Sequence, residues 1–304
     1  MIVITIISFE MQDVLTYELN NHLPMDTLIQ MMRVNQSHRQ EALAVFHQRG
    51  CDAIIKRLKT IFGQHYDQFE TLFQQCGAIL SGSFVLQCLL GEEWPSDVDI
   101  YIPILGNDLS NPDYNHPKSS LENFIYQTQG FYVYHEDIKT YDFDNETKMI
   151  FLRQYVWLSA TDNDDNHNNT LKKFIDDHDT SRTHYKYEKF DAVDNNRKAL
   201  RQCVQNQHKT LTVDTGQEKV VLNTTHLQCI LVDCHKNEMI NFIKDEYDFD
   251  ICKNVFWLDD QHQLYIHALY DIINKQTTFK YTTKIETSEK RKEKYEQRGF
   301  TFTQ

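Results

Sequence analysis

The sequence predicts an α+β protein, because patterns typical of helices and of strands alternate along the chain and no internal repeat is visible. Three observations carry this prediction. Residues 11–75 place apolar side chains at helical spacing. Residues 76–103 show a strand, a turn, a helix and a second strand in succession. Residues 131–158 and 219–259 contain runs rich in aromatic and β-branched side chains, which favour strands.

The composition sets limits on the architecture. The chain has 304 residues, of which 40% are hydrophobic, so it can bury a core as two modest domains or as one domain with additions. It contains no uninterrupted apolar run of about 18 residues, so we expect no transmembrane helix. The first residues are apolar but lack a basic region and a cleavage site of small residues, which disfavours a signal peptide.

Cysteine usage and charge point to a cellular compartment and limit the partners. Seven cysteines are scattered without a C-x-x-C pair, which predicts reduced thiols and argues against a zinc module. We therefore expect an intracellular protein, cytoplasmic or nuclear, including within an infected host cell. The formal net charge of −13 disfavours broad non-specific binding to nucleic acid, although a local basic groove is compatible with it.

The first half of the 76–103 stretch predicts a buried strand that turns directly into a buried helix. Residues 77–80 are a short apolar run that suits a strand end, and residues 81–83 (Ser-Gly-Ser) suit a tight turn. Residues 84–90 are apolar nearly all round, and Gly91 stands where a C-terminal glycine belongs. Gly82 allows close backbone approach, and the helix that begins at Ser83 offers N–H groups to an anion such as phosphate.

The second half predicts a strand with two carboxylates on one face. After the loop at residues 92–96, residues 97–102 (DVDIYI) alternate with a period of two, so Asp97 and Asp99 share a face. Two such carboxylates repel each other unless a cation lies between them, and hard oxygen ligands suit Mg²⁺ or Mn²⁺. An anion site followed by a metal-binding Asp pair is what phosphoryl or nucleotidyl transfer requires.

These residues resemble the hallmark of the polymerase β-type nucleotidyltransferase superfamily: Gly82-Ser83, a short helix, then Asp97-x-Asp99 between apolar residues. The resemblance implies a mixed β-sheet core with helices, over residues 51–304. It implies that Gly82 and Ser83 hold the triphosphate of a nucleotide such as ATP. It also implies that Asp97 and Asp99 bind two metal ions.

The resemblance further requires a third carboxylate on a later strand, which helps to hold the catalytic metal and can act as the base. Residues 247–252 (YDFDIC) alternate as a strand would and place Asp248 and Asp250 on one face. Either can serve as a metal ligand, and we favour Asp248 because an aromatic-Asp-apolar strand start after a helix fits the family pattern. Asp233, at the end of the run HLQCILVD, is the competing candidate. The alternative is that Asp248 and Asp250 line a solvent-facing edge.

Residues 1–50 predict a small helical module ahead of this core. The order of a helix, residues 22–24 (HLP), Asp26-x-Leu28 and a further helix resembles an F-box, the module that docks on the Skp1 adaptor. Met11-Gln12 departs from the Leu-Pro that often opens that family's motif. A docking surface would use apolar residues that could equally form an internal core: Leu15, Leu19, Leu23, Pro24 and Leu28.

Two further segments carry predictions of their own. Residues 160–197 are rich in Asp, Asn and His, which predicts a polar insertion at the surface. The tail Arg-x-x-Lys-Tyr-x-x-Arg-Gly-Phe resembles endings of nucleotidyltransferase-like proteins of viruses and fungi. Its basic residues could contact triphosphate or an anionic acceptor, or could line a solvated helix with the aromatic residues packed inward: Arg291, Lys294, Arg298, Tyr295 and Phe300.

Two functions from different classes follow. The first is a metal-dependent enzyme that moves a nucleoside monophosphate from an NTP to an acceptor hydroxyl on RNA, protein or a small molecule. The second is an adaptor that binds Skp1 through residues 11–50 and uses an inactive nucleotidyltransferase fold as an interaction surface. The sequence leaves the acceptor open, and neither function needs a membrane.

Overall fold

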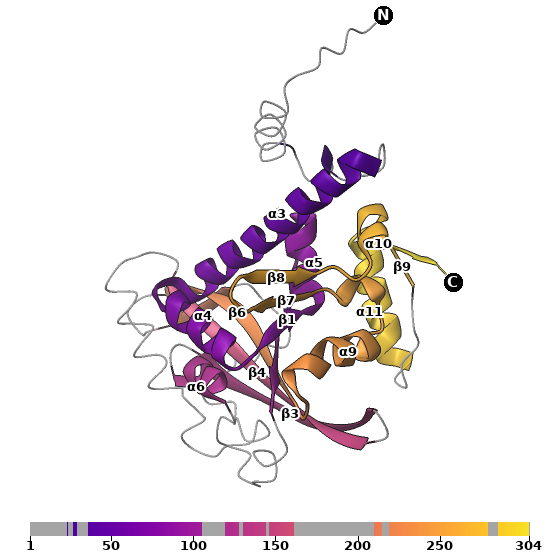
Figure 1. Cartoon of the computed structure of the whole chain (residues 1–304). Coiled ribbons are helices and arrows are strands. Elements are labelled where there is room, and N and C mark those ends of the chain that lie inside the picture. Colours follow the sequence, from indigo (N-terminus) through magenta and orange to yellow (C-terminus); the bar gives the residue numbers. More distant parts are fainter. Residues whose placement is uncertain are drawn as a thin grey trace, which may run out of the picture.

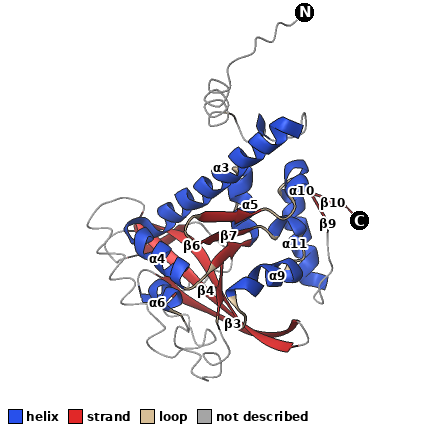
Figure 2. Cartoon of the chain, in the orientation of Figure 1, coloured by secondary structure: helices blue, strands red, loops and turns tan. Residues whose placement is uncertain are grey.

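A computed structural model describes residues 23, 27–28, 36–104, 119–127, 130–143, 146–160, 210–214, 219–278 and 285–303. Within these residues, helices pack around a mixed β-sheet, which confirms the predicted α+β class (Figure 2). We find no helix there that combines the length and the hydrophobicity needed to cross a bilayer. The cysteines of the described residues are all free thiols.

The main sheet has eight strands. They are β1 (Ile79–Ser81), β2 (Val98–Pro103), β3 (Gly130–Phe143), β4 (Glu146–Ala160), β5 (Thr210–Asp214), β6 (Lys219–Val232), β7 (Val255–Leu258) and β8 (His262–Tyr265). Their order is β3-β4-β6-β2-β1-β7-β8, and β5 pairs with β6. In this sheet β2 and β6 run parallel, whereas the other paired strands run antiparallel.

The helices pack on this sheet and at its ends. They are α3 (Gln36–Phe62), α4 (Tyr66–Gln75), α5 (Gly82–Leu90), α6 (Ser120–Gln127), α9 (Lys236–Glu246), α10 (Leu269–Asn274) and α11 (Ile285–Gln297), with 3-10 turns η1 (Gly63–His65) and η4 (Asp250–Cys252). A second, two-stranded parallel sheet joins β9 (Gln276–Thr278) to β10 (Thr301–Thr303). Figure 1 shows α10, β9 and the C-terminus together at one end of the molecule.

The predicted strand, helix and strand of residues 76–103 are confirmed as β1, α5 and β2, whereas the turn predicted at residues 81–83 is not a separate element, because Ser81 ends β1 and Gly82 begins α5. The chain passes from β1 into α5 without an intervening loop, and Gly91 ends α5 in a left-handed conformation with φ 67°. In β2, Val98, Ile100 and Ile102 are buried, whereas Asp99 is only partly buried. The sheet register sets Ser81 of β1 opposite Asp99. The strand predicted for residues 97–102 is thus confirmed from Val98 onward, and Asp97 directly precedes it.

The long helix α3 joins the N-terminal region to the sheet. It crosses α5 and β8 (Figure 1). A Cβ atom on Gly50 would lie 2.9 Å from a methyl of Leu89 and 2.8 Å from one of Leu264, so glycine lets α3 approach both elements. The helix is continuous through residue 50, so the predicted boundary between an N-terminal module and the core falls inside a helix.

Most of the F-box-like segment and of the polar insertion lies outside the described residues. Leu15, Leu19 and Pro24 belong to the undescribed part, as do residues 161–197. Leu28 is fully buried, and the guanidinium of Arg49 donates a hydrogen bond to the carbonyl of Leu23. These two contacts tie residues 23 and 28 to the rest of the fold.

The strands predicted within residues 219–233 are confirmed and join into one continuous strand, β6, with which β4 pairs from Val232 to Leu222. Another strand prediction is wrong. Residues 247–252 are not a strand: Asp248 lies in a bend after α9, and Asp250–Cys252 form η4. The Nδ2 of Asn254 donates to the carbonyl of Ile251 at 2.6 Å and holds this turn. Alternation over six residues could not reveal that local hydrogen bond.

Candidate functional site

The predicted nucleotide-binding glycine lies directly against the predicted metal-binding aspartate. Gly82 has φ 77°, and a Cβ atom there would meet Oδ2 of Asp99 at 2.3 Å and the hydroxyl of Tyr247 at 2.6 Å. Both the backbone angle and the contact therefore require glycine. The strand-to-helix turn and the carboxylate thus form one compact unit.

The N-terminus of α5 opens beside this unit. Ser81 occupies the N-cap position, but its side chain makes no capping hydrogen bond. Its hydroxyl instead donates to the carbonyl of Asn254 at 2.7 Å. Gly82 and Ser83 therefore begin a nine-residue helix with no side-chain cap, which is an arrangement that favours an anion.

Two tyrosines position the Asp99 carboxylate. The hydroxyl of Tyr101, on the same face of β2, donates to the hydroxyl of Tyr247 at 2.8 Å. The hydroxyl of Tyr247 in turn donates to Oδ2 of Asp99 at 3.4 Å. The second bond is long, so it orients Asp99 more than it stabilises its charge.

Burial disfavours ionisation of both aspartates of the pair. Burial, and secondarily the charge of Asp97, raise the pKa of Asp99 to about 8, although Arg291 and Lys294 oppose this. Burial also raises the pKa of Asp97, which His226 and Lys294 partly offset. Carboxylates held in this way gain strongly from an added cation.

Asp248 is the most buried carboxylate of the site. Its side chain is 1% exposed, and Nη1 of Arg291 lies 3.0 Å from its Oδ2. Neither carboxylate oxygen has a side-chain hydrogen-bond partner of good geometry, so the arginine is close without being aligned. Burial raises the pKa of Asp248, and Arg291 opposes that rise.

The competing third carboxylate, Asp233, lies at the wrong end of the sheet. In the parallel pair, Asp99 lies opposite Gln228 of β6, whereas Val232 lies opposite Pro103. Asp233 follows Val232 and is therefore near the far end of β2. At the Asp99 end, β6 supplies Gln228 and His226 rather than a carboxylate.

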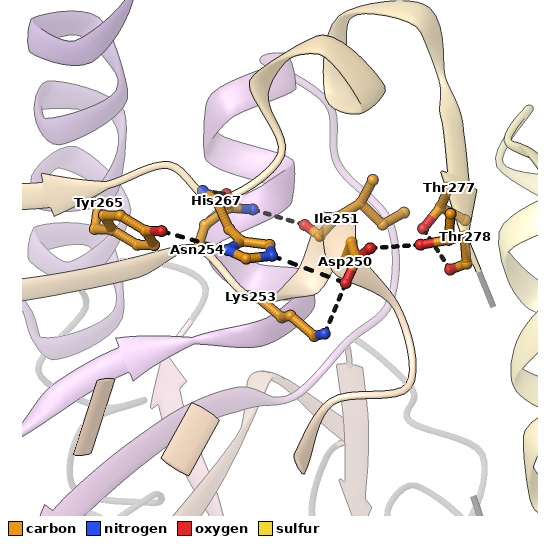
Figure 3. Close-up of polar contacts among 8 residues, drawn as sticks. All are labelled: Asp250, Ile251, Lys253, Asn254, Tyr265, His267, Thr277 and Thr278. Carbon is orange, nitrogen blue, oxygen red and sulfur yellow. Dashed lines mark hydrogen bonds and ion pairs between the residues drawn. The ribbon is translucent and has the colours of Figure 1, made fainter. Parts of the chain in front are cut away.

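Asp250, predicted as a metal ligand beside Asp248, lies in a separate polar cluster (Figure 3). Its Oδ1 accepts a hydrogen bond from Lys253 at 2.6 Å and lies 3.8 Å from Nε2 of His267, while Thr278 donates to its Oδ2. Burial opposes ionisation, but the bonds from Lys253 and Thr278 hold the pKa of Asp250 below its usual value. The prediction that Asp248 and Asp250 share a strand face is wrong, because η4 turns the chain between them.

Helix α11 faces the acidic residues with its basic side chains. Arg291 pairs with Asp248, and Nη2 of Arg298 donates to the carbonyl of Pro95 at 3.0 Å. Lys294, which lies between them in sequence, opposes the rise in the pKa of both Asp97 and Asp99. The predicted inward packing of the aromatic residues Tyr295 and Phe300 is confirmed. The predicted contact of the cations with a triphosphate or an anionic acceptor stays a prediction.

The loop before Asp97 is held from two sides. Oε1 of Gln87 accepts the backbone N–H of Trp94 at 3.0 Å, and Arg57 donates to the carbonyl of Glu92 at 2.5 Å. On the other side, the guanidinium of Arg298 lies 4.7 Å from the Trp94 ring. Asp97 thus follows a loop that is fixed to α3, to α5 and to the turn after α11.

The donor chemistry fits the divalent cation that the nucleotidyltransferase resemblance implies. Carboxylate oxygens are the ligands that Mg²⁺ and Mn²⁺ prefer, and the two oxygens of Asp248 are buried without hydrogen-bond donors. Within the described residues, no three His, Cys, Asp or Glu side chains already converge closely enough to hold an ion. Arg291 lies against Asp248 instead.

Sequence reasoning missed several residues of this site: His226, Tyr101, Tyr247 and Trp94. Tyr101 could have been found, because it continues the face of Asp97 and Asp99 along the strand. Tyr247 and His226 come from segments more than a hundred residues away, and only the sheet register brings them near.

The comparisons with known proteins give one result. A family model described as Gabija anti-defense 2 family protein matches residues 53–275. No curated protein and no solved structure gives a significant match. The match begins within α3 and ends before α11. Because it covers more than half of the 304 residues, the chain belongs to the Gabija anti-defense 2 family.

Proposed function

We propose that this chain is a metal-dependent nucleotidyltransferase, and that nucleotidyl transfer is the means by which it serves the anti-defense role in its family's name. One observation carries the proposal: Asp99 lies against Gly82 at the uncapped start of α5, within range of the charge of Asp97. Two carboxylates so close together each raise the other's cost of ionisation, and such pairs are concentrated at functional sites.

The reaction would join an acceptor hydroxyl to the α-phosphorus of an NTP. The new O–P bond forms as the bond between the α-phosphorus and the bridging oxygen to the β-phosphorus breaks, so pyrophosphate leaves. The hydroxyl proton passes to a carboxylate of the site or to solvent. The acceptor is a hydroxyl of RNA, a protein or a small molecule.

Different residues of the site would bind the phosphates, bind the metal ions and orient the carboxylate. The start of α5, with Gly82 and Ser83, would hold the β- and γ-phosphates through backbone N–H groups. Asp97, Asp99 and Asp248 would hold two Mg²⁺ or Mn²⁺ ions, which activate the attacking oxygen and neutralise the leaving phosphates when bound. Tyr247 keeps the Asp99 carboxylate oriented towards Gly82.

Calorimetry tests the site directly. We expect NTP to bind wild-type protein only with Mg²⁺ or Mn²⁺, and the double variant Asp97→Asn/Asp99→Asn to lose that binding. Asp260→Asn, at an exposed position in the β7–β8 turn, is the matched control and should bind as wild type does. Wild-type protein that binds no NTP with either metal would refute the proposal.

A cellular test links the chemistry to the family. Asp97→Ala should lose NTP turnover and protection against the Gabija defence together, while Asp260→Asn keeps both. Protection that survives in Asp97→Ala would separate the anti-defense role from this site.

The adaptor alternative has no observation in its favour among the described residues. Of the proposed docking residues, Leu28 is fully buried in this fold and Leu23 is partly buried. A pull-down with purified Skp1, with Leu23→Asp as the control, would revive this alternative if wild-type protein were enriched over the control.

A further inference from the structure

Three cations follow one another along α11 and into the turn after it. Arg291 and Lys294 lie three residues apart on α11, so they share a side of the helix, and Arg298 lies in the turn directly after Gln297, where α11 ends. The position of this row is fixed by Tyr295, which is buried. The Tyr295 hydroxyl lies 2.9 Å from the sulfur of Cys252, and its ring lies 5.0 Å from that of Phe249.

The row follows the carboxylates of the site. Arg291 is 3.0 Å from Asp248 at one end, and Arg298 is bonded to Pro95, two residues before Asp97, at the other. Lys294 lies between them and acts on Asp97 and Asp99. Two single positive charges, on Arg291 and Lys294, therefore face three carboxyl groups.

The contact between Arg291 and Asp248 is incomplete. A permanent arginine partner usually donates two parallel hydrogen bonds to a carboxylate. Here both oxygens of Asp248 lack a donor of good geometry, although the side chain is only 1% exposed. The ion pair of Lys253 with Asp250, two residues away, is aligned at 2.6 Å and shows that this segment can form a complete one. Asp248 therefore has a counter-charge but no aligned side-chain donor on its oxygens.

The side chain of Arg291 can also move away from Asp248 into solvent. Its side chain is 44% exposed, while its partner is almost fully buried. A rotation about its side-chain bonds would bring the guanidinium into solvent without moving α11, which is held by Tyr295. Asp248 has no such freedom.

We propose that Arg291, assisted by Lys294, is a displaceable counter-ion that neutralises Asp248 and the Asp97–Asp99 pair while no divalent cation is bound, and gives up that position when one binds. This inference rests on the proposed function, because it assumes that these carboxylates take a divalent metal. It assigns to α11, outside the family match, the control of metal entry.

The consequence is coupling between metal and nucleotide. A metal that binds alone must break the ion pair and leave Arg291 without a partner. When the triphosphate binds as well, it offers the released guanidinium a new anionic partner. Metal and NTP should therefore each strengthen the binding of the other, and Arg291 should carry part of that coupling.

The test is calorimetric titration of Mn²⁺, without nucleotide, into full-length wild type and Arg291→Gln. Removal of the competing charge should tighten Mn²⁺ binding about tenfold. Lys292→Gln is the matched control: it removes one charge from the same helix, where Lys292 lies 5.5 Å from the Phe302 ring, and it should leave the affinity unchanged. Arg291→Lys keeps the charge and should bind Mn²⁺ within about threefold of wild type.

The outcomes separate the two proposals. Wild type that binds Mn²⁺ and NTP, with Arg291→Gln binding Mn²⁺ equally or more weakly, overturns the counter-ion and leaves the nucleotidyltransferase intact. Arg291→Lys that tightens binding as much as Arg291→Gln also overturns it, because charge would not be the cause. Absence of Mn²⁺ binding in wild type and in both variants, with or without NTP, removes the proposed function and this inference together.

Discussion

Asp248 and Asp250 are two residues apart, yet they differ in burial, in hydrogen bonding and in the direction of their pKa shifts. Asp250 accepts hydrogen bonds from Lys253 and Thr278, and its pKa is lowered. Asp248 is more deeply buried, has one misaligned arginine beside it, and its pKa is raised. A carboxylate whose acceptor positions are filled within the chain stabilises the fold. A buried carboxylate whose positions are open is a candidate for binding something else.

The largest expected effect separates these two residues by activity. Asp248→Asn should lower NTP turnover by about 100-fold or more, because it removes a ligand charge from the site. Asp250→Asn should keep turnover within a few-fold. The order of the two variants should be the opposite for stability. Asp250→Asn should lower the free energy of unfolding by about 2 kcal/mol, whereas Asp248→Asn should lower it little or raise it.

Turnover assays and thermal unfolding of both variants measure this contrast. Equal loss of turnover in the two variants would break the distinction between a structural and a functional carboxylate. A strongly destabilised Asp248→Asn would do so as well, because it would show that Arg291 and Asp248 are a structural pair.

Alanine substitutions at two glycines measure how tightly Asp99 packs against the start of α5. Gly82 and Gly91 both have left-handed φ angles, 77° and 67°, but a Cβ at Gly91 would meet nothing within 4 Å. Alanine should cost about 1 kcal/mol at Gly91, from the backbone alone, and about 3 kcal/mol at Gly82, where it also displaces Asp99. Denaturant unfolding of the two variants gives the difference. Equal costs would mean that Asp99 moves away freely.

The raised pKa of Asp99 predicts a pH dependence of stability. Since the folded pKa is about 8 and the unfolded value is about 4, its contribution is fully present below pH 4 and is lost as pH rises towards 8. In metal-free buffer with a chelator, Asp99→Asn should therefore be more stable than wild type at pH 9, by on the order of 2 kcal/mol. The two proteins should converge near pH 4, and parallel stability profiles would count against the burial of this carboxyl.

The smallest effect concerns the tyrosine pair. Tyr247→Phe removes a 3.4 Å hydrogen bond to Asp99 and leaves the Tyr101 hydroxyl without its acceptor. We expect a loss of about 1 kcal/mol in stability and a modest weakening of Mn²⁺ binding. Tyr270→Phe, at an exposed position on α10, is the control. Unchanged Mn²⁺ affinity in Tyr247→Phe would show that Asp99 is oriented without it.

The sequence predicted the local parts of this site better than its assembly. The strand, helix and strand of residues 76–103 were predicted correctly because they follow one another and each has its own periodicity. That Asp97 shares a face with Asp99 stays a prediction, because Asp97 precedes β2. The strand expected over residues 247–252 failed, because η4 depends on the side-chain bond from Asn254 to the Ile251 carbonyl.

The contacts between segments that are distant in the sequence could not be predicted from periodicity. No local pattern predicts that β6 lies beside β2 in parallel, or that Arg291 of α11 pairs with Asp248, which is far from it in the sequence. The ranking of Asp233 against Asp248 depended on this register. The F-box-like residues 15, 19 and 24 and the insertion at 161–197 lie outside the described residues, so those predictions stay predictions.

The pairing of β2 with β6 also sets the order of events in synthesis. Each β2 residue pairs in the sheet with a β6 residue that is synthesised roughly 130 residues later. Arg291, which pairs with Asp248, is synthesised later still. During translation the acidic face of β2 therefore exists for some time without its neighbours. A chain interrupted before α11 would hold Asp97, Asp99 and Asp248 but would lack the basic row. The site is therefore complete only after the residues of α11 have been made.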